Sequence, residues 1–164
     1  MKKLKVLMVD DEPDIRIELN DFLLELGFEA VLAANGEEGL AKFKSHPDIH
    51  IVLSDLTMPG MSGLGLLERI TSDEDTKDRV RRFVFMTGNG DTRSVIEAMR
   101  LGASEFMLKP IDLSLLEDIL MESKEFVLAE QFKLLNAQAR EAQLAASEVE
   151  ISSLNRGIKK AYGE

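Results

Sequence analysis

The sequence contains no cysteine, which excludes disulfide bonds and thiolate metal sites. It also lacks any apolar run approaching the roughly 20 residues that span a bilayer. The lysines at its start precede only the short stretch Val6–Val9, which is not the apolar core of a signal peptide. These absences predict a soluble, cytoplasmic protein that contacts no membrane.

The sequence also lacks an excess of basic residues over acidic ones. The formal net charge is −10, whereas a protein that binds the phosphate backbone of nucleic acids needs a clustered basic face. No G-x-x-x-x-G-K-[ST] pattern occurs, so a P-loop nucleotide site is not supported. We therefore expect no direct binding of nucleic acid.

The chain of 164 residues suits one domain of about 120 residues with an appendage. Its most informative stretch is Ile49–Gly63, where an apolar run ends at Asp55 and a loop rich in proline and glycine follows. Such a run is typical of a central strand in a parallel sheet, buried on both faces. Similar runs predict strands at residues 4–9, 28–33, 83–86 and 106–108.

Between these strands, apolar residues at three- and four-residue spacing predict helices. The helix that Asp91 or Thr92 can cap is expected to turn Val95, Ile96 and Met99 inward. Residues 72–82 show no periodicity and predict a solvated loop. The alternation of strand and helix predicts an α/β fold with a doubly wound parallel sheet of five strands.

Polar side chains follow four of the predicted strands: Asp10, Asp11, Asp55, Thr87 and Lys109. Each one alone is explained by a helix cap, a turn or a solvated loop. Together they are significant, because the carboxyl ends of parallel strands meet at the edge of the sheet where ligands bind.

Four motifs in a fixed order carry a resemblance: VDDEPD at 9–14, SDLTMPGMSG at 54–63, MTGNG at 86–90 and GASEFMLKP at 102–110. Residues 1–121 resemble the receiver domain of a two-component response regulator. The resemblance implies a flavodoxin-like sheet with strand order 2-1-3-4-5. It also implies that Asp55 accepts a phosphoryl group from a histidine kinase, a phosphotransfer protein or a small phosphodonor.

Crowded carboxylates repel one another unless a cation lies among them, and a set of oxygen ligands selects Mg²⁺ or Mn²⁺. By the resemblance, Asp11, Asp55 and the backbone carbonyl of Thr57 bind this metal directly. Asp10 belongs to the same metal site and acts through water.

The resemblance also gives roles to residues around the phosphoryl group. Lys109 and Thr87 are expected to contact its oxygens. Phe106 is the candidate aromatic switch, although it would also fill the core as an ordinary side chain. Thr57 and Asn89 occupy positions that set the lifetime of the phosphate.

Two further features follow from the resemblance. The peptide bond before Pro110 is expected to be cis, which an X-Pro bond tolerates. Phosphorylation is expected to switch the face formed by the helix after residue 91, the strand at 106–108 and the last helix, and so to control partner or dimer interactions. The chain would be a signalling phosphoacceptor that catalyses only its own phosphoryl transfer and dephosphorylation.

Residues 122–164 have a different composition, with no proline and many Ala, Glu, Gln and Lys, and they favour one helical extension. From Met121 onward, apolar residues recur at alternating spacings of three and four, with Glu125 as the misfit: Met121, Leu128, Phe132, Leu135, Ala139, Ala142, Ala146 and Val149. This pattern indicates a coiled coil, and hence a homodimer. Ile151, Leu154 and Ile158 follow a shifted register. A solvated helix or a linker is the alternative.

Two other functions stay open at this point. The chain could be the N-terminal receiver of a longer regulator, with an enzymatic output domain beyond residue 164. It could also be a small phosphatase with an Asp nucleophile on the first strand, but that family has an Asp two residues after the nucleophile, and here Glu12 follows Asp10 by two.

Overall fold

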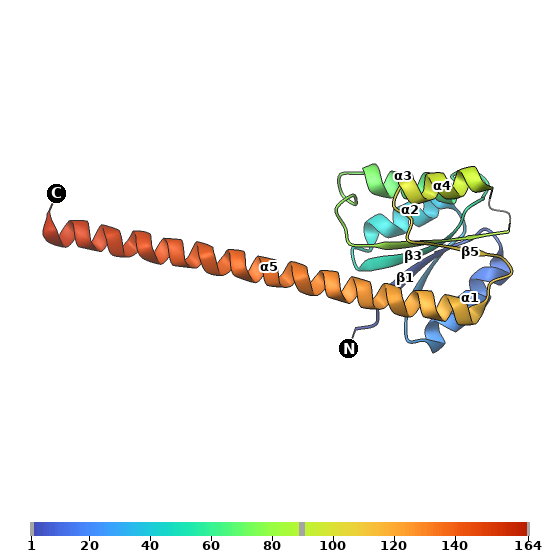
Figure 1. The fold of residues 1–164 in the computed structure, drawn as a ribbon, viewed down its shortest axis with the longest axis horizontal. Helices are drawn as coiled ribbons and strands as arrows, with labels where there is room; N and C mark the ends of the chain where they lie inside the picture. Colours follow the sequence, from blue (N-terminus) through green and yellow to red (C-terminus); the bar gives the residue numbers. More distant parts are fainter. Residues whose placement is uncertain (1, 89–90, 164) are drawn as a thin grey trace. The chain divides into compact units, whose positions relative to one another are not determined.

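The computed structural model describes residues 2–88 and 91–163. The strands are β1 (Lys5–Val9), β2 (Glu29–Ala33), β3 (Ile49–Asp55), β4 (Arg82–Thr87) and β5 (Glu105–Leu108). They form one parallel sheet in the order β2-β1-β3-β4-β5, which confirms the predicted class and strand order (Figure 1). The helices are α1 (Pro13–Glu25), α2 (Gly36–Ser45), α3 (Gly63–Ser72), α4 (Thr92–Arg100) and α5 (Leu113–Tyr162).

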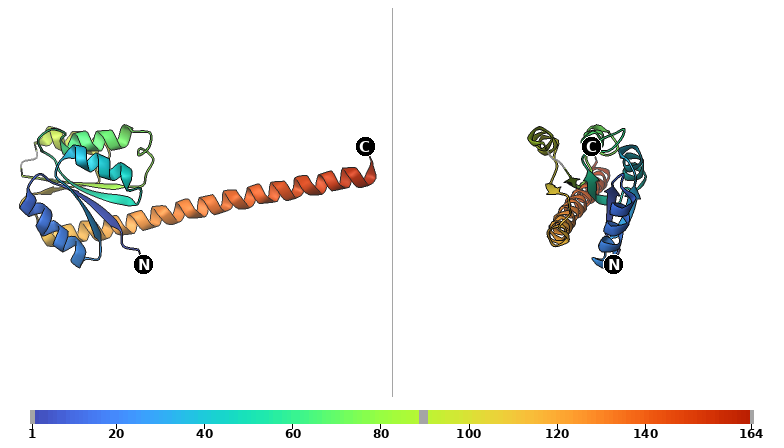
Figure 2. Two further views of the ribbon diagram at one scale, coloured as in Figure 1. Left: turned by 180° about the vertical axis from the view of Figure 1, so that it is seen from behind. Right: turned by 90° about the vertical axis from the view of Figure 1, so that its right-hand side faces the viewer.

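Helices cover both faces of the sheet, so the domain has two cores. One core joins the sheet to α2, α3 and α4 through side chains such as Phe43, Leu66 and Ala98. The other joins it to α1 and the first part of α5 through Leu23 and Leu120 (Figures 1 and 2). Because the central strands are covered on both sides, they require nearly continuous apolar sequence, which is what the runs show.

Side-chain caps fix the first residues of α2, α3 and α4, at the edge of the sheet where the strands end. The side chains of Asn35, Ser62 and Asp91 each accept a hydrogen bond from a backbone N–H in the first turn of α2, α3 and α4. Such caps satisfy donors that the helix itself cannot pair. Each helix therefore begins at a fixed place just after a strand has ended.

One sequence expectation about packing is wrong, and a second holds only in part. In α4, Ile96 and Met99 are 47% and 52% exposed, and Ala98 is the buried residue of that helix. The apolar spacing there marks an outward face. The connection between α3 and β4 is only partly solvated, because Thr76 is 1% exposed and its hydroxyl donates to the Ile70 carbonyl. Arg79 in that connection donates to the carbonyls of three residues, Phe43, His46 and Ile49.

The chain divides into two compact units, a receiver unit (Met1–Val127) and a tail (Leu128–Glu164). The last residue of α5 buried against the sheet is Val127. The helix continues as a single element to Tyr162, which confirms the predicted long C-terminal helix. Within the described ranges, none of the helices has the length and apolar character needed to cross a membrane.

Candidate functional site

The candidate site lies where β1, β3, β4 and β5 end. The ladder pairs Val9 with Ser54, and Asp55 with Met86, so the residues that follow β1 and end β3 are neighbours. At β5 the ladder pairs Thr87 with Leu108, the residue before Lys109. The parallel register thus brings together groups that are up to about a hundred residues apart in the chain.

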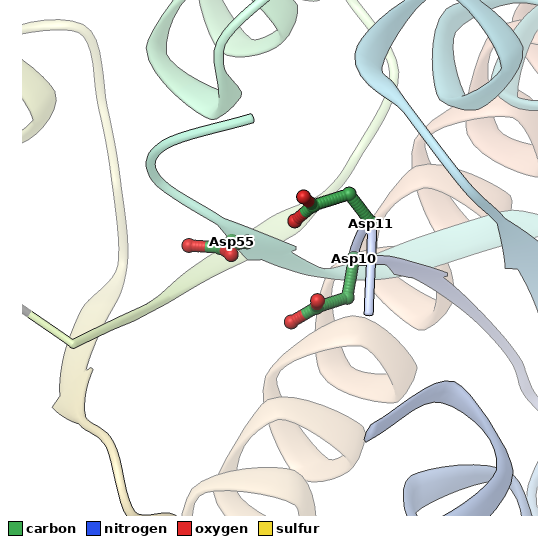
Figure 3. Close-up of side chains that lie close together, drawn as sticks. All are labelled: Asp10, Asp11 and Asp55. Carbon is green, nitrogen blue, oxygen red and sulfur yellow. The ribbon is translucent and has the colours of Figure 1, made fainter. Parts of the chain in front are cut away.

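Three carboxylates meet at this edge. Asp10, Asp11 and Asp55 each offer an oxygen that lies within 4.8 Å of the others (Figure 3). Asp10 is fully buried and Asp55 is 6% exposed, whereas Asp11 is exposed. The cluster is therefore shielded from solvent at Asp10 and Asp55 and accessible to solvent at Asp11.

The Lys109 ammonium bridges the buried carboxylates. Its Nζ lies 2.8 Å from Asp10 Oδ2 and 3.1 Å from Asp55 Oδ2. Burial alone would lower the pKa of Lys109, but its hydrogen bonds and charge interactions with Asp10 and Asp55 outweigh burial and raise the pKa above its usual value. The lysine therefore stays charged at any physiological pH.

At Asp55, burial has a larger effect on the pKa than the hydrogen bonds do. Burial raises the pKa of Asp55 above its ordinary value, and the nearby charge of Asp10 acts in the same direction. The hydrogen bonds from Lys109 and from the Thr57 amide work against this rise. A second cation beside Asp55 would favour the ionised carboxylate further.

Hydrogen bonds to Asp10 hold the segment that follows β1 in place. The Glu12 N–H donates to Asp10 Oδ1 over 2.9 Å, and an Arg16 guanidinium N–H donates to the Asp10 carbonyl over 2.6 Å. The Glu12 carboxylate is itself 3.3 Å from Lys109 Nζ. Sequence reasoning missed this fourth carboxylate, since an Asp-Asp-Glu run in a loop carries no signal for which members turn inward.

The other predicted residues lie around this cluster. Thr57 is exposed, and its N–H donates to Asp55 Oδ1 over 3.2 Å. Thr87 is 2% exposed, and its carbonyl accepts from the Lys109 N–H over 2.8 Å. The Lys109–Pro110 peptide bond is cis. Asn89 lies outside the described residues.

Phe106 lies on β5, the strand that leads to Lys109. It is half-buried, and its ring centroid lies 5.6 Å from that of Phe85, with the planes tilted by 40°. Phe85 in turn contacts the start of α3, since a Cβ on Gly63 would lie 2.9 Å from its ring. The aromatic pair thus connects β5 to the element that follows Asp55.

Comparison with known proteins decides the family. The model of the response regulator receiver domain matches residues 6–121 of the chain. The chain belongs to the receiver domain family. Members of this family are signalling phosphoacceptors rather than conventional enzymes, and neither of the two alternative functions is better supported.

Relatives of this receiver include both short and long proteins. It is 38% identical over 110 residues to a probable chemotaxis protein CheY of Rhizobium etli, covering 66% of this chain and 83% of that protein. It is 33% identical over 106 residues to the two-component response regulator PprB of Pseudomonas aeruginosa, covering 65% of this chain but only 38% of that protein. The match to the longer regulator is therefore a match to part of it.

Solved structures give the same result. A crystal structure of the CheX-CheY-BeF3-Mg²⁺ complex from Borrelia burgdorferi superposes with a TM-score of 0.66 at 32% identity. The match covers 73% of this chain and 87% of that one. The receiver fold is thus shared with a chemotaxis protein whose structure includes Mg²⁺.

The carboxylate cluster of this receiver suits a metal ion. All three groups are oxygen donors, two of them are buried, and the charge of one lysine offsets only part of theirs. Hard divalent cations prefer such ligands.

Proposed function

We propose that Asp55 is the phosphoacceptor of this receiver and that it takes a phosphoryl group from a histidine kinase, a phosphotransfer protein or a small phosphodonor. The supporting observation is its position: Asp55 ends β3 beside two other carboxylates, with Lys109 Nζ 3.1 Å from its Oδ2. A carboxylate oxygen attacks phosphorus while the bond between phosphorus and the donor breaks, which leaves an acyl phosphate on Asp55.

Lys109 and Thr87 would stabilise the transferred group. The transferring phosphoryl spreads negative charge over its oxygens, so a fixed cation and a hydroxyl donor lower the barrier. Lys109 now pairs with Asp10 and Asp55, and a phosphoryl oxygen on Asp55 would take the place of the Asp55 partner. Thr87 ends the neighbouring strand β4 and would donate its hydroxyl to another oxygen.

Asp11, Asp55 and the Thr57 carbonyl would hold Mg²⁺ or Mn²⁺, with Asp10 acting through a water molecule. The donor set fits, and Mg²⁺ is present in the related Borrelia complex. The bound metal would supply positive charge to the transferring oxygens. Thr57 and Asn89 would then set how readily water reaches the phosphate, and the chain would catalyse only its own transfer and dephosphorylation.

The readout would use α4, β5 and the start of α5. Ile96 and Met99 on α4 and Leu108 on β5 are 47%, 52% and 68% exposed, so each is available to a partner that covers this face. Phe106 lies on β5 and would change position when Thr87 turns toward the phosphoryl group. A histidine kinase or an output protein in the cytoplasm is the expected partner, by analogy with the family.

The tail would pair with a second copy of the chain. Its large apolar residues, such as Phe132 and Leu135 at 66% and 64% exposed, have no cover within the described residues. Positions that flank the predicted seam decide partner choice in coiled coils. Here they are almost uncharged: Ala129, Gln131, Asn136, Gln138, Gln143, Ala145 and Glu150. Two copies of this acidic chain can therefore meet without strong repulsion along the seam.

Labelling with acetyl phosphate and Mg²⁺ tests the phosphoacceptor. The wild-type chain should gain one phosphoryl group by intact mass, and Asp55→Asn should gain none because it lacks an anionic nucleophile. Asp48→Asn removes an Asp that directly precedes β3, at the opposite end of this strand from Asp55, and that pairs with Lys2 and Lys5. It is the matched control and should label normally. Full labelling of Asp55→Asn would overturn the proposal.

Lys109→Ala separates metal binding from transfer. The three carboxylates remain in this variant, so Mg²⁺ should still bind, as measured by calorimetry. Labelling should slow at least tenfold, because a positioned cation in a transfer site contributes that much or more. An unchanged labelling rate would remove Lys109 from the mechanism.

A further inference from the structure

The loop between β3 and α3 (residues 56–62) leaves Asp55 and returns to it. The Gly63 N–H donates to the Leu56 carbonyl over 2.9 Å and closes the loop at its base. A Cβ on Gly63 would lie 2.0 Å from the Asp55 carbonyl oxygen, so the first residue of α3 packs directly against the backbone of Asp55. Thr57 lies in the first half of this closed loop.

The outer half of the loop is held by the first turn of α2. The Glu37 Oε1 accepts a hydrogen bond from the Met61 N–H over 2.9 Å. A Cβ on Gly36 would lie 2.6 Å from the Met61 carbonyl oxygen, and Gly60 has a φ of +76° with Glu37 Oε1 2.9 Å from its ideal Cβ. Glycine on both sides allows helix and loop to approach this closely.

The first turn of α2 is itself firmly fixed. The Asn35 side chain accepts from the Glu38 N–H over 2.8 Å, and Glu38 Oε2 accepts from the Ala34 N–H over 2.9 Å. This pair is similar to a capping box, except that the Glu38 carboxylate accepts from the N–H of the residue before the N-cap rather than from that of the N-cap itself. Phe43 further along the helix is fully buried. Glu37 therefore extends toward the loop from a rigid support.

We propose that Glu37 is a positioning residue for the phosphorylation site, acting through the loop at residues 56–62. Its carboxylate holds Met61, and thereby keeps Thr57 in the place where its carbonyl and side chain stand beside Asp55. The inference rests on the proposed function, because it concerns how Thr57 is presented to the metal and to the phosphate. Leu56 and Met58 are each 6% exposed in the core, so the loop keeps buried anchors when Glu37 is replaced.

Three variants of the full chain test this role through the Mg²⁺ affinity of the unphosphorylated protein, measured by calorimetry. Glu37→Ala should weaken Mg²⁺ binding about fivefold, the factor that corresponds to the net contribution of a typical hydrogen bond. Glu37→Gln loses the same charge but keeps an oxygen acceptor for Met61, so it should bind within about twofold of wild type. Glu68→Ala removes an exposed carboxylate from α3 and should also leave binding unchanged.

A second readout follows the loop directly. Amide hydrogen exchange over residues 56–62 should be faster in Glu37→Ala and normal in Glu37→Gln. Wild-type Mg²⁺ affinity in Glu37→Ala, or equal losses in Glu37→Ala and Glu37→Gln, would overturn the positioning role. Failure of the wild-type chain to accept a phosphoryl group would instead overturn the proposed function, so the two failures are distinguishable.

Discussion

The part of helix α5 in the receiver unit and the longer part in the tail contain similar apolar side chains in opposite surroundings. Leu116 and Leu120 in the receiver unit are fully buried under the sheet, whereas Leu135 and Leu144 in the tail are 64% and 67% exposed. The receiver part is therefore stabilised by packing. The tail part depends on local propensity, which is high because Ala, Glu, Gln, Lys and Leu dominate it.

The two units differ in where they place their apolar side chains. The receiver unit buries its own apolar faces on both sides of a sheet. The tail exposes a row of large apolar residues over several turns, which is costly in water unless another surface covers it. We therefore expect substitutions in the tail to change association without changing phosphorylation of the receiver unit.

The largest expected effect concerns association. Replacing Phe132 and Leu135 with Glu should convert a dimer to a monomer in light scattering, since four like charges would enter the seam of the dimer. Each apolar side chain removed contributes roughly 1.5–3 kcal/mol when buried. Labelling of Asp55 should be unchanged in this variant.

The wild-type chain provides the control for that experiment. If it is a monomer at high micromolar concentration, with and without phosphorylation, the tail is a linker or a docking helix for another chain. The exposed apolar residues of the tail would then not be covered by a second copy of this chain.

A smaller effect concerns the receiver unit alone. Mg²⁺ that binds only the folded site should stabilise it by about 2.7 kcal/mol at a hundred times the dissociation constant, and so raise the melting temperature. Asp11→Ala should remove most of this rise, because it removes a metal ligand. A rise of equal size in both proteins would point to general screening of the acidic chain.

The smallest effect concerns pH and a surface far from the site. Hydrogen bonds from Lys2 and Lys5 lower the pKa of Asp48 to about 2. A carboxyl with a lowered pKa in the folded state contributes stability above its unfolded pKa, near 3.9, and loses it as the pH falls toward 2. Because the pair is partly exposed, the contribution is at most about 1 kcal/mol.

Melting of Asp48→Asn against wild type checks this contribution. The wild-type advantage should be present at neutral pH and should shrink as the pH falls from about 4 to about 2. An advantage that persists at the lowest pH would mean that Asp48 acts through packing. Tail association should not depend on this residue at all.

Much of the receiver unit was predictable from sequence, and for a physical reason. A strand covered on both faces must be apolar along its length, so β3 and β4 stand out as runs. Polar groups at the ends of such strands must share one edge, and this brought Asp10, Asp55 and Lys109 together as expected. The strand order followed from the family resemblance.

What sequence reasoning missed depends on contacts between distant segments. Spacing alone cannot tell an inward apolar face from an outward one, which is why Ile96 and Met99 were misplaced. Arg79 lies in a charged stretch, yet it ties three backbone carbonyls together and stacks 3.9 Å from the centroid of Phe43. The contact between Glu37 and Met61 likewise has no local signature.

Mapping the phosphoryl group after acetyl phosphate treatment tests the central claim most directly. Reduction with borohydride converts an aspartyl phosphate to homoserine and releases the phosphate, which marks the residue that carried it. Cleavage after Lys and Arg separates Asp55, on the peptide of residues 45–69, from Asp10 and Asp11, on the peptide of residues 6–16. We predict homoserine at position 55 on the longer peptide, and homoserine at position 10 or 11 would contradict the assignment of Asp55.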